Sequence, residues 1–147
     1  MKRLILLLLF PLTLIAQEAQ TKLLYVEKIE GIPFEDVKIL LKTALDGKNM
    51  NVLEVIDISQ KPKMTVFYVC NLSYGEKILR VFPQFGTLAP CRIYILERGD
   101  GNVEVGYINI SNLIKGFRKY FTSEVVEVFL RADKDIKEAI KEVKGGF

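Results

Sequence analysis

The chain lacks histidine and tryptophan throughout its 147 residues. Histidine is the commonest general base and metal ligand, and it activates the nucleophile in many serine and cysteine enzymes. Its absence excludes the serine–histidine and cysteine–histidine arrangements. A phosphate loop of the G-x-G-x-x-G or Walker type is also lacking, since Gly99 and Gly101 lie in a short hairpin-like turn. The sequence identifies no catalytic residue and implies no cofactor, so it favours a non-catalytic protein without excluding an enzyme.

The net charge of the chain is also small. The 21 lysine and arginine residues oppose 18 aspartate and glutamate residues, and two of the basic residues, Lys2 and Arg3, lie at the very start of the chain. Nucleic-acid-binding proteins usually concentrate a basic excess on one face, whereas these charges are interleaved, so we expect no nucleic-acid partner. The abundance of lysine, glutamate and aliphatic residues is typical of heat-adapted proteins.

The N-terminal residues are typical of an export signal. A short basic start precedes an uncharged run from Leu4 to Ala16, and small and polar residues follow. This run is shorter than the roughly 20 apolar residues of a spanning helix, and Pro11 interrupts it. We expect a signal peptide over residues 1–16, cleaved no later than residue 19, and a periplasmic or secreted protein with no stable membrane span after cleavage. An uncleaved N-terminal anchor is the alternative.

Residues 21–147 alternate between strand and helix patterns, which predicts one domain. Strand patterns cover Leu23–Ile29, Asn51–Ile58, Met64–Cys70, Cys91–Arg98 and Val103–Ile110. Helix patterns cover Phe34–Asp46, Tyr74–Phe82, a segment that begins at Ser111 or Asn112, and Glu124–Val143, the last as one helix or as two with a restart at Asp133. The order is β-α-β-β-α-β-β-α-α. Short turns between strands favour hairpins, so we expect an α+β fold with a mainly antiparallel sheet of about five strands and helices packed on one face.

Two helix ends carry specific signals. Gly47 follows the first helix pattern and is expected to end it in the left-handed conformation. Ser73 and Glu76 have the spacing of a capping box and predict the start of the second helix.

Four stretches, in a fixed order, resemble a known family. They are "NVLEVIDISQ", the pair "CN", "FPQFGTLAPCRIYILE" and "VEVGYINISNLIKGF". Together they resemble the family of the domain of unknown function 302, in a cysteine-bearing, exported branch. The resemblance implies a small α+β domain with a β-α-β-β start and a four-stranded antiparallel segment, often as a homodimer. It supplies a fold rather than a function.

The same resemblance suggests site residues. Cys70-Asn71 is similar to the "CN" of cysteine-bearing members, Pro90-Cys91-Arg92 to their "PCR", and Glu97 to the acidic residue that closes the strand. Leu72 stands where many relatives have proline, and Tyr107-Ile108-Asn109 follows their pattern only loosely. Asn71, Arg92 and Glu97 are therefore candidate ligand-binding residues.

Cys70 and Cys91 are the only cysteines, and several roles are open to them. In an oxidising compartment a disulfide closing a loop of about 22 residues contributes about 3 kcal/mol. A reversible redox pair and two buried inert thiols are the alternatives, while metal binding has least support because two thiolates half-fill a tetrahedral site. Antiparallel neighbouring strands would bring the sulfurs close, and a parallel crossover would separate them. Strand alternation directs Cys91 toward the core.

Two further groups of residues allow a functional or a structural interpretation. Glu54, Asp57, Glu97 and Glu104 include possible acid/base pairs, but strands need a solvated face, which is the commoner reason for such residues. The segment from Lys115 to Phe121 mixes basic and aromatic residues. That mixture suits a nucleic-acid or membrane surface, and it suits an amphipathic helix docked on a sheet still better.

These observations favour an exported, non-catalytic binding or accessory domain, expected to be a homodimer, for an unidentified small ligand or protein partner. A thiol/disulfide redox or sulfur-handling protein using Cys70 and Cys91 is the alternative. Metal or haem binding is a weaker one.

Overall fold

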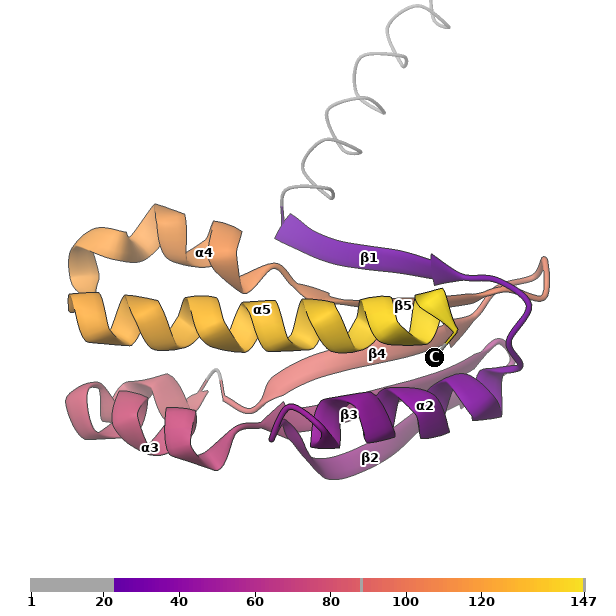
Figure 1. Ribbon diagram of the computed structural model, residues 1–147, viewed down its shortest axis with the longest axis horizontal. Coiled ribbons are helices and arrows are strands. Elements are labelled where there is room, and N and C mark those ends of the chain that lie inside the picture. Colours follow the sequence, from indigo (N-terminus) through magenta and orange to yellow (C-terminus); the bar gives the residue numbers. More distant parts are fainter. Residues whose placement is uncertain (1–22, 88, 147) are drawn as a thin grey trace, which may run out of the picture.

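A computed structural model describes residues 23–87 and 89–146, so the predicted signal peptide lies outside the described residues. Its strands are β1 (Leu24–Ile29), β2 (Asn51–Gln60), β3 (Lys63–Cys70), β4 (Cys91–Glu97) and β5 (Val103–Ile108). Its helices are α2 (Phe34–Asp46), α3 (Leu72–Val81), α4 (Ile110–Phe117) and α5 (Ser123–Gly145), with short 3-10 helices η1 (Pro83–Thr87) and η2 (Arg118–Tyr120). Figure 1 shows this order, which confirms the predicted fold class.

The five strands form one antiparallel sheet in the order β1-β5-β4-β3-β2. The hairpins β2–β3 and β4–β5 follow from turn-forming residues between alternating segments, as predicted. The first strand instead lies at the edge of the sheet opposite to β2 and pairs with β5, where Leu24 lies opposite Ile108. Val69 of β3 lies opposite Cys91 of β4, so the strands that carry the two cysteines are antiparallel neighbours.

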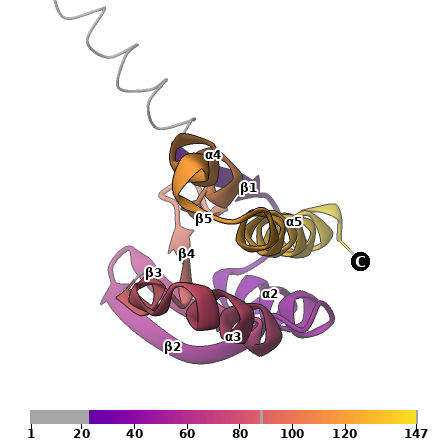
Figure 2. The same cartoon turned by 90° about the vertical axis from the view of Figure 1, so that its left-hand side faces the viewer.

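One face of the sheet is buried and the other is open. Figure 2 shows α2 and α5 side by side on one face. Residues directed to that face include Phe67, Ile93 and Val105, each 2% exposed or less. The opposite face carries Val66 and Tyr94, which remain partly exposed. This asymmetry is the usual pattern of an antiparallel sheet with a single helical layer.

Helix α2 shows how the sequence builds the buried layer. Val37, Leu41 and Leu45 recur at helical spacing, and all three are fully buried. Burial of each such side chain contributes about 1.5 to 3 kcal/mol. Helix α5 presents Ile136, Ile140 and other apolar side chains to the same core.

Three predictions of helix ends were wrong, one each at the end of α2, the start of α3 and the start of α4. Gly47 has the right-handed φ of −60°, and the left-handed residue of that turn is Asn49. Helix α3 begins at Leu72, before Ser73, because the Asn71 side chain accepts a hydrogen bond from the Tyr74 N–H at 3.1 Å.

The start of α4 also differs from its prediction. Helix α4 is capped by Asn109, whose side chain accepts from the Asn112 N–H, rather than by Ser111 or Asn112. Helix α5 runs without a break through Asp133, which confirms the one-helix alternative over a restart at that residue. Within residues 23–87 and 89–146, no helix combines the length and apolar character that crossing a membrane requires.

Candidate functional site

A small apolar cavity lies where the start of β4 and the end of β5 meet α4, η1 and α5. Its lining residues are Phe85, Pro90, Cys91, Arg92, Tyr107, Ile108, Ile110, Leu113, Ile114 and Phe129. Its volume is about 150 Å³. The rings of Phe85 and Phe129 meet edge to face with their centroids 4.6 Å apart, so an aromatic pair fixes one wall.

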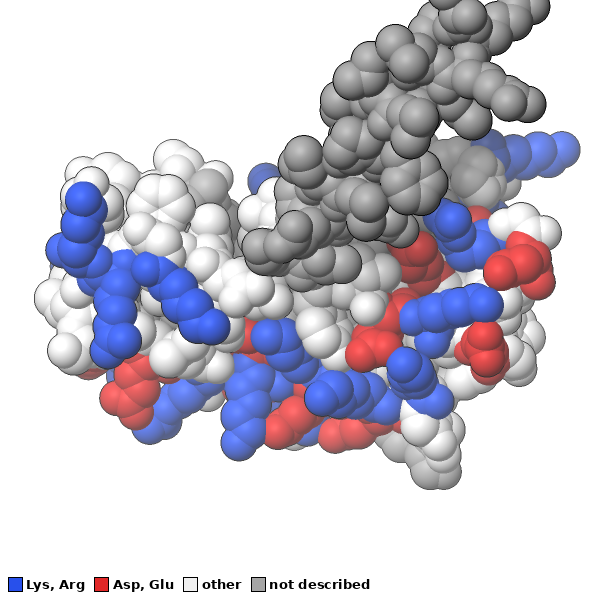
Figure 3. Space-filling model, turned by 90° about the horizontal axis from the view of Figure 1, so that it is seen from above, with Lys and Arg blue, Asp and Glu red and all other residues white. Residues whose placement is uncertain are grey.

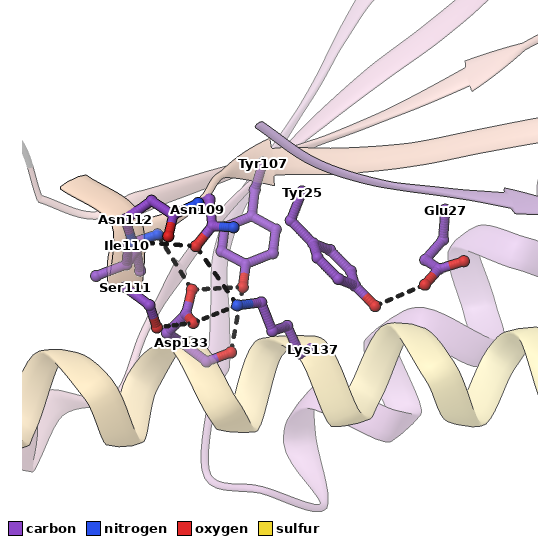
Figure 4. Close-up of polar contacts among 9 residues, drawn as sticks. All are labelled: Tyr25, Glu27, Tyr107, Asn109, Ile110, Ser111, Asn112, Asp133 and Lys137. Carbon is purple, nitrogen blue, oxygen red and sulfur yellow. Dashed lines mark hydrogen bonds and ion pairs between the residues drawn. The ribbon is translucent and has the colours of Figure 1, made fainter. Parts of the chain in front are cut away.

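Figure 4 shows a buried polar cluster around Asp133. Tyr107 belongs to this cluster and also lines the cavity. Asp133 is 2% exposed and lies on the inner face of α5. Its carboxylate accepts hydrogen bonds from the Tyr107 hydroxyl at 2.7 Å and from the Ile110 backbone N–H at 3.1 Å. Ser111 also donates to it, and Lys137 forms an ion pair with it at 2.6 Å. One carboxylate thus joins α5 to the β5–α4 connection.

These contacts keep Asp133 ionised. Burial alone would raise the pKa of Asp133, but the hydrogen bonds from Lys137, Ser111 and Tyr107 outweigh it, and the pKa lies below its ordinary value of 3.8. Burial and the negative charge of Asp133 raise the pKa of Tyr107, so its hydroxyl stays protonated as a donor. With every neighbour donating, Asp133 is suited to a structural anchor and poorly suited to abstracting a proton.

Lys137 extends the cluster toward the edge of the sheet. Its ammonium group lies 3.4 Å from the Asn109 side-chain oxygen and 5.3 Å from the centre of the Tyr25 ring. The Tyr25 hydroxyl donates to Glu27 at 2.7 Å, and Glu27 also pairs with Lys144. These contacts therefore connect β1 with the C-terminal half of α5.

The sequence interpretation missed this cluster because it considered Asp133 only as the point where a second helix would begin, if α5 were two helices. One signal was present: Asp133 occupies the apolar face of the helix pattern between Phe129 and Ile136. A carboxylate on an apolar face must find buried donors. Ser111, proposed as a cap, is instead one of those donors.

The two cysteines lie near one another without forming a bond. Both are free thiols, half-buried, and Cys70 is one residue beyond the Val69–Cys91 pair. The Cys70 sulfur lies 3.3 Å from the position that a Cβ on Gly75 would occupy, so the thiol packs under the first turns of α3. Cys91 packs against the core and lines the cavity.

Neither thiol is activated. Burial, followed by the nearby Cys70 and Asp133 groups, raises the pKa of Cys91 to about 11, and burial also raises the pKa of Cys70. The thiolate is the nucleophile and metal ligand, so both cysteines are mainly in the unreactive form near neutral pH.

The other candidate residues are dispersed. Asn71 caps α3 and borders an open polar depression with Asn49 and Asn51. Arg92 is exposed on the open face of the sheet, with its guanidinium 5.3 Å from the Tyr68 ring, and it also lines the cavity. Glu97 ends β4 at the opposite end of that strand. The structure therefore brings Cys91 and Arg92 to one pocket, and places Asn71 and Glu97 elsewhere.

Two of the four strand carboxylates, Asp57 and Glu104, have structural partners. Asp57 accepts from the Thr65 hydroxyl at 2.6 Å, and Glu104 accepts from the Tyr94 hydroxyl at 2.8 Å. Over the described ranges, 23–87 and 89–146, no three Cys, Asp or Glu side chains gather in a way that could hold a metal ion.

The fold and the pocket define a class: a small α+β domain with one antiparallel sheet, one helical layer and an apolar pocket beside a buried carboxylate. The family model of the "Domain of unknown function DUF302" matches residues 25–143, and the chain belongs to that family. It is 77% identical, over all 147 residues and the full length of both chains, to an "Uncharacterized protein" of Aquifex aeolicus (strain VF5).

A solved structure has the same fold. The crystal structure of an uncharacterized conserved DUF302 protein from Bacillus stearothermophilus is similar with a TM-score of 0.71 and 15% sequence identity. The similarity covers 82% of this chain and 98% of that one.

Proposed function

We propose that this chain is an exported, non-catalytic domain that binds a small apolar ligand in the cavity between β4, β5, α4 and α5. The cavity itself is the observation that carries the proposal. Ligand pockets are mainly apolar with a few polar groups, and this one combines aromatic and aliphatic walls with the Cys91 thiol.

The volume limits the size of the ligand. An engineered protein cavity of about 150 Å³ lined by leucine, isoleucine and phenylalanine binds benzene or xenon. The present cavity has about the same volume and a similar lining. The Tyr107 hydroxyl already donates its hydrogen bond to Asp133, so Tyr107 presents its apolar ring to the cavity. A single aromatic ring or a short alkyl group fits this space.

Benzene is a suitable probe, with thermal unfolding as the measurement. A ligand that binds only the native state raises the melting temperature with its concentration. Leu113→Phe places a larger side chain in the lining and is expected to abolish the shift, whereas Leu130→Phe, on an exposed position of α5, keeps it. Absence of any shift in the parent protein, or an equal shift in the Leu113 variant, would overturn the proposal.

Export is tested separately. The basic start and apolar run support cleavage after about residue 16. N-terminal sequencing of the protein from its own host is expected to begin between residues 17 and 20. A chain that still begins at Met1 supports the anchor, or no export.

A disulfide or redox function is the second candidate, and the placement of Cys70 and Cys91 on neighbouring antiparallel strands favours it. The raised pKa values oppose rapid thiol chemistry, so a structural disulfide is the form we favour within this alternative. Thiol titration with and without reductant distinguishes the forms. Two thiols that remain free after oxidation with disulfide reagents would eliminate this candidate.

A further inference from the structure

The segment from Lys115 to Tyr120, at the end of α4 and through η2, exposes every one of its residues. Phe117 is 49% exposed and Tyr120 is 68% exposed, and their ring centroids lie 6.4 Å apart. The docked face of α4 is formed by Ile110 and Ile114 instead. Helix docking therefore does not explain the two rings. We call Lys115, Phe117, Arg118, Lys119 and Tyr120 the basic-aromatic patch.

The positive charges of the basic-aromatic patch are not neutralised locally. The sequence has no aspartate or glutamate from residue 105 to residue 123, and the next acid, Glu124, begins α5. Several exposed cations elsewhere have carboxylate partners, as in the pairs Lys42–Asp46 and Arg131–Glu127. Among the described residues, none lies in an ion pair with Lys115, Arg118 or Lys119. Figure 3 shows blue side chains across a mainly white surface at the left-hand end, where Figure 1 has α4.

Apolar side chains of α3 enlarge this end of the molecule. Phe82 is 40% exposed, and its ring centroid lies 5.9 Å from that of Phe121, just after the patch. Val81 beside it is 52% exposed. Figure 2 views the molecule from this end and shows α3 and α4 both facing the viewer. Exposed rings, aliphatic groups and unpaired cations therefore share one end.

We propose that this end of the molecule docks on an anionic phospholipid surface. Aromatic side chains favour the membrane interface, and nearby lysine and arginine residues are attracted to anionic headgroups. The combination with exposed Phe82 and Val81 fits a lipid surface better than RNA, which calls for a larger basic groove with stacking platforms. The proposal is independent of the ligand in the cavity.

Vesicle co-sedimentation tests whether binding requires the positive charges of the basic-aromatic patch. All variants keep the apolar run over residues 4–16, so that any contribution of this run to vesicle binding is the same in each variant. The triple variant K115Q/R118Q/K119Q is compared with K42Q/K61Q/K134Q, which removes the same charge from exposed positions away from the patch. Partitioning onto vesicles of phosphatidylglycerol and phosphatidylcholine is expected to fall on the order of a hundredfold in the patch variant only. High salt should remove the same difference.

A fluorescence measurement tests the contact itself. Since the chain has no tryptophan, Tyr120→Trp introduces a single fluorophore at the patch, and Tyr68→Trp introduces one on the open sheet face. Anionic vesicles are expected to shift the emission of the Tyr120→Trp variant to shorter wavelength and leave that of the Tyr68→Trp control unchanged. Both substitutions replace one aromatic residue by another at positions that are not fully buried, so folding is retained.

Three results would overturn the proposal. One is equal partitioning of the patch variant and its charge-matched control. A second is unchanged emission of the Tyr120→Trp variant when it is bound to anionic vesicles. The third is binding of single-stranded RNA that requires the patch, with no charge-dependent binding to vesicles.

Discussion

At the scale of single residues, Asp133 combines burial with full hydrogen bonding. Its carboxylate receives the hydroxyl groups of Tyr107 and Ser111, the N–H of Ile110 and the ammonium of Lys137. Loss of the acceptor would leave several donors unsatisfied, which costs more than the net contribution of ordinary hydrogen bonds. The cluster also holds Tyr107 against the cavity, so its integrity matters for any ligand bound there.

Asp133→Asn is expected to lower the free energy of unfolding by about 2 to 3 kcal/mol, because it removes a charge from a largely buried ion pair. Urea denaturation at pH 7 measures the change. Glu127→Gln on the exposed side of α5 is the control, with an expected change of about 0.5 kcal/mol or less.

The same variant has a defined pH dependence. The pKa of Asp133 in the folded protein is below its ordinary value of 3.8, so its contribution is fully present above pH 4 and is lost as the pH falls through the folded pKa. The difference between the parent and Asp133→Asn should therefore narrow below about pH 4. A difference that stays constant down to pH 2 would contradict an ionised Asp133.

The thiols give a second prediction at this scale. Because burial raises the pKa of Cys91 to about 11, its thiolate fraction is small near neutral pH and increases until the pH passes 11. In the native, reduced protein iodoacetamide should modify Cys70 before Cys91, and both more slowly than in guanidinium. Peptide mass spectrometry gives the order. Faster modification of Cys91 would mean that its side chain is open to solvent.

At the scale of the elements, caps decide where the helices begin. Asn71 and Ser73 are both good capping residues two positions apart, and the sequence alone favours Ser73 through Glu76. In the structure β3 ends at Cys70, so Asn71 is the first residue free to cap. The choice depends on where the strand ends, which the local pattern does not determine.

Asn71→Ala is therefore expected to destabilise the protein by about 1 kcal/mol, and Ser73→Ala by no more than a few tenths. Chemical denaturation of the two variants gives a direct comparison. The reverse ranking would restore the capping box as the start of α3.

The β4–β5 hairpin contains a close contact that fixes one ring. The Tyr94 ring crosses Gly106, where an added Cβ would lie 2.7 Å from it, and the Tyr94 hydroxyl donates to Glu104. Gly106→Ala should force the ring aside and cost about 1 to 2 kcal/mol. In a Tyr94→Ala background the same substitution should cost much less, which a double-mutant cycle measures. An equal cost in both backgrounds would assign the effect to the backbone.

At the scale of the whole molecule, no helix of the described chain covers the open face of the sheet. Exposed apolar residues on or beside it include Val26, Leu53, Ile58 and Ile108, each between 38% and 56% exposed. Large exposed apolar areas commonly mark protein interfaces. The open face is thus the surface on which we place the homodimer expected from the sequence.

Light scattering during size-exclusion chromatography is expected to give twice the mass of one chain. Val26→Lys, in the middle of the β1 edge, should shift the equilibrium toward the monomer, whereas Ile39→Lys, at an exposed position of α2 on the other side of the sheet, should not. A monomeric parent at micromolar concentration would refute the dimer.

The sequence predicted the features that depend on neighbours in the chain. Alternating residues and the Gly99–Asn102 turn identified both hairpins, and helical spacing identified α2 and α5. The pairing of β1 with β5 and the meeting of Asp133 with Ser111 join distant segments, for which the local pattern holds no signal. Cys91 was correctly directed inward by alternation, while the cavity that it lines depends on five separate elements.

The position of β1 at the edge of the sheet also determines when the sheet can be completed. During synthesis β1 emerges before every other strand of the described sheet. It pairs there with β5, so Leu24 cannot pair until Ile108 has been made. Closing so long a loop is slow compared with forming the two hairpins. The strand β1 is therefore the last to be paired, and its own edge stays open to other partners until most of the polypeptide has been made.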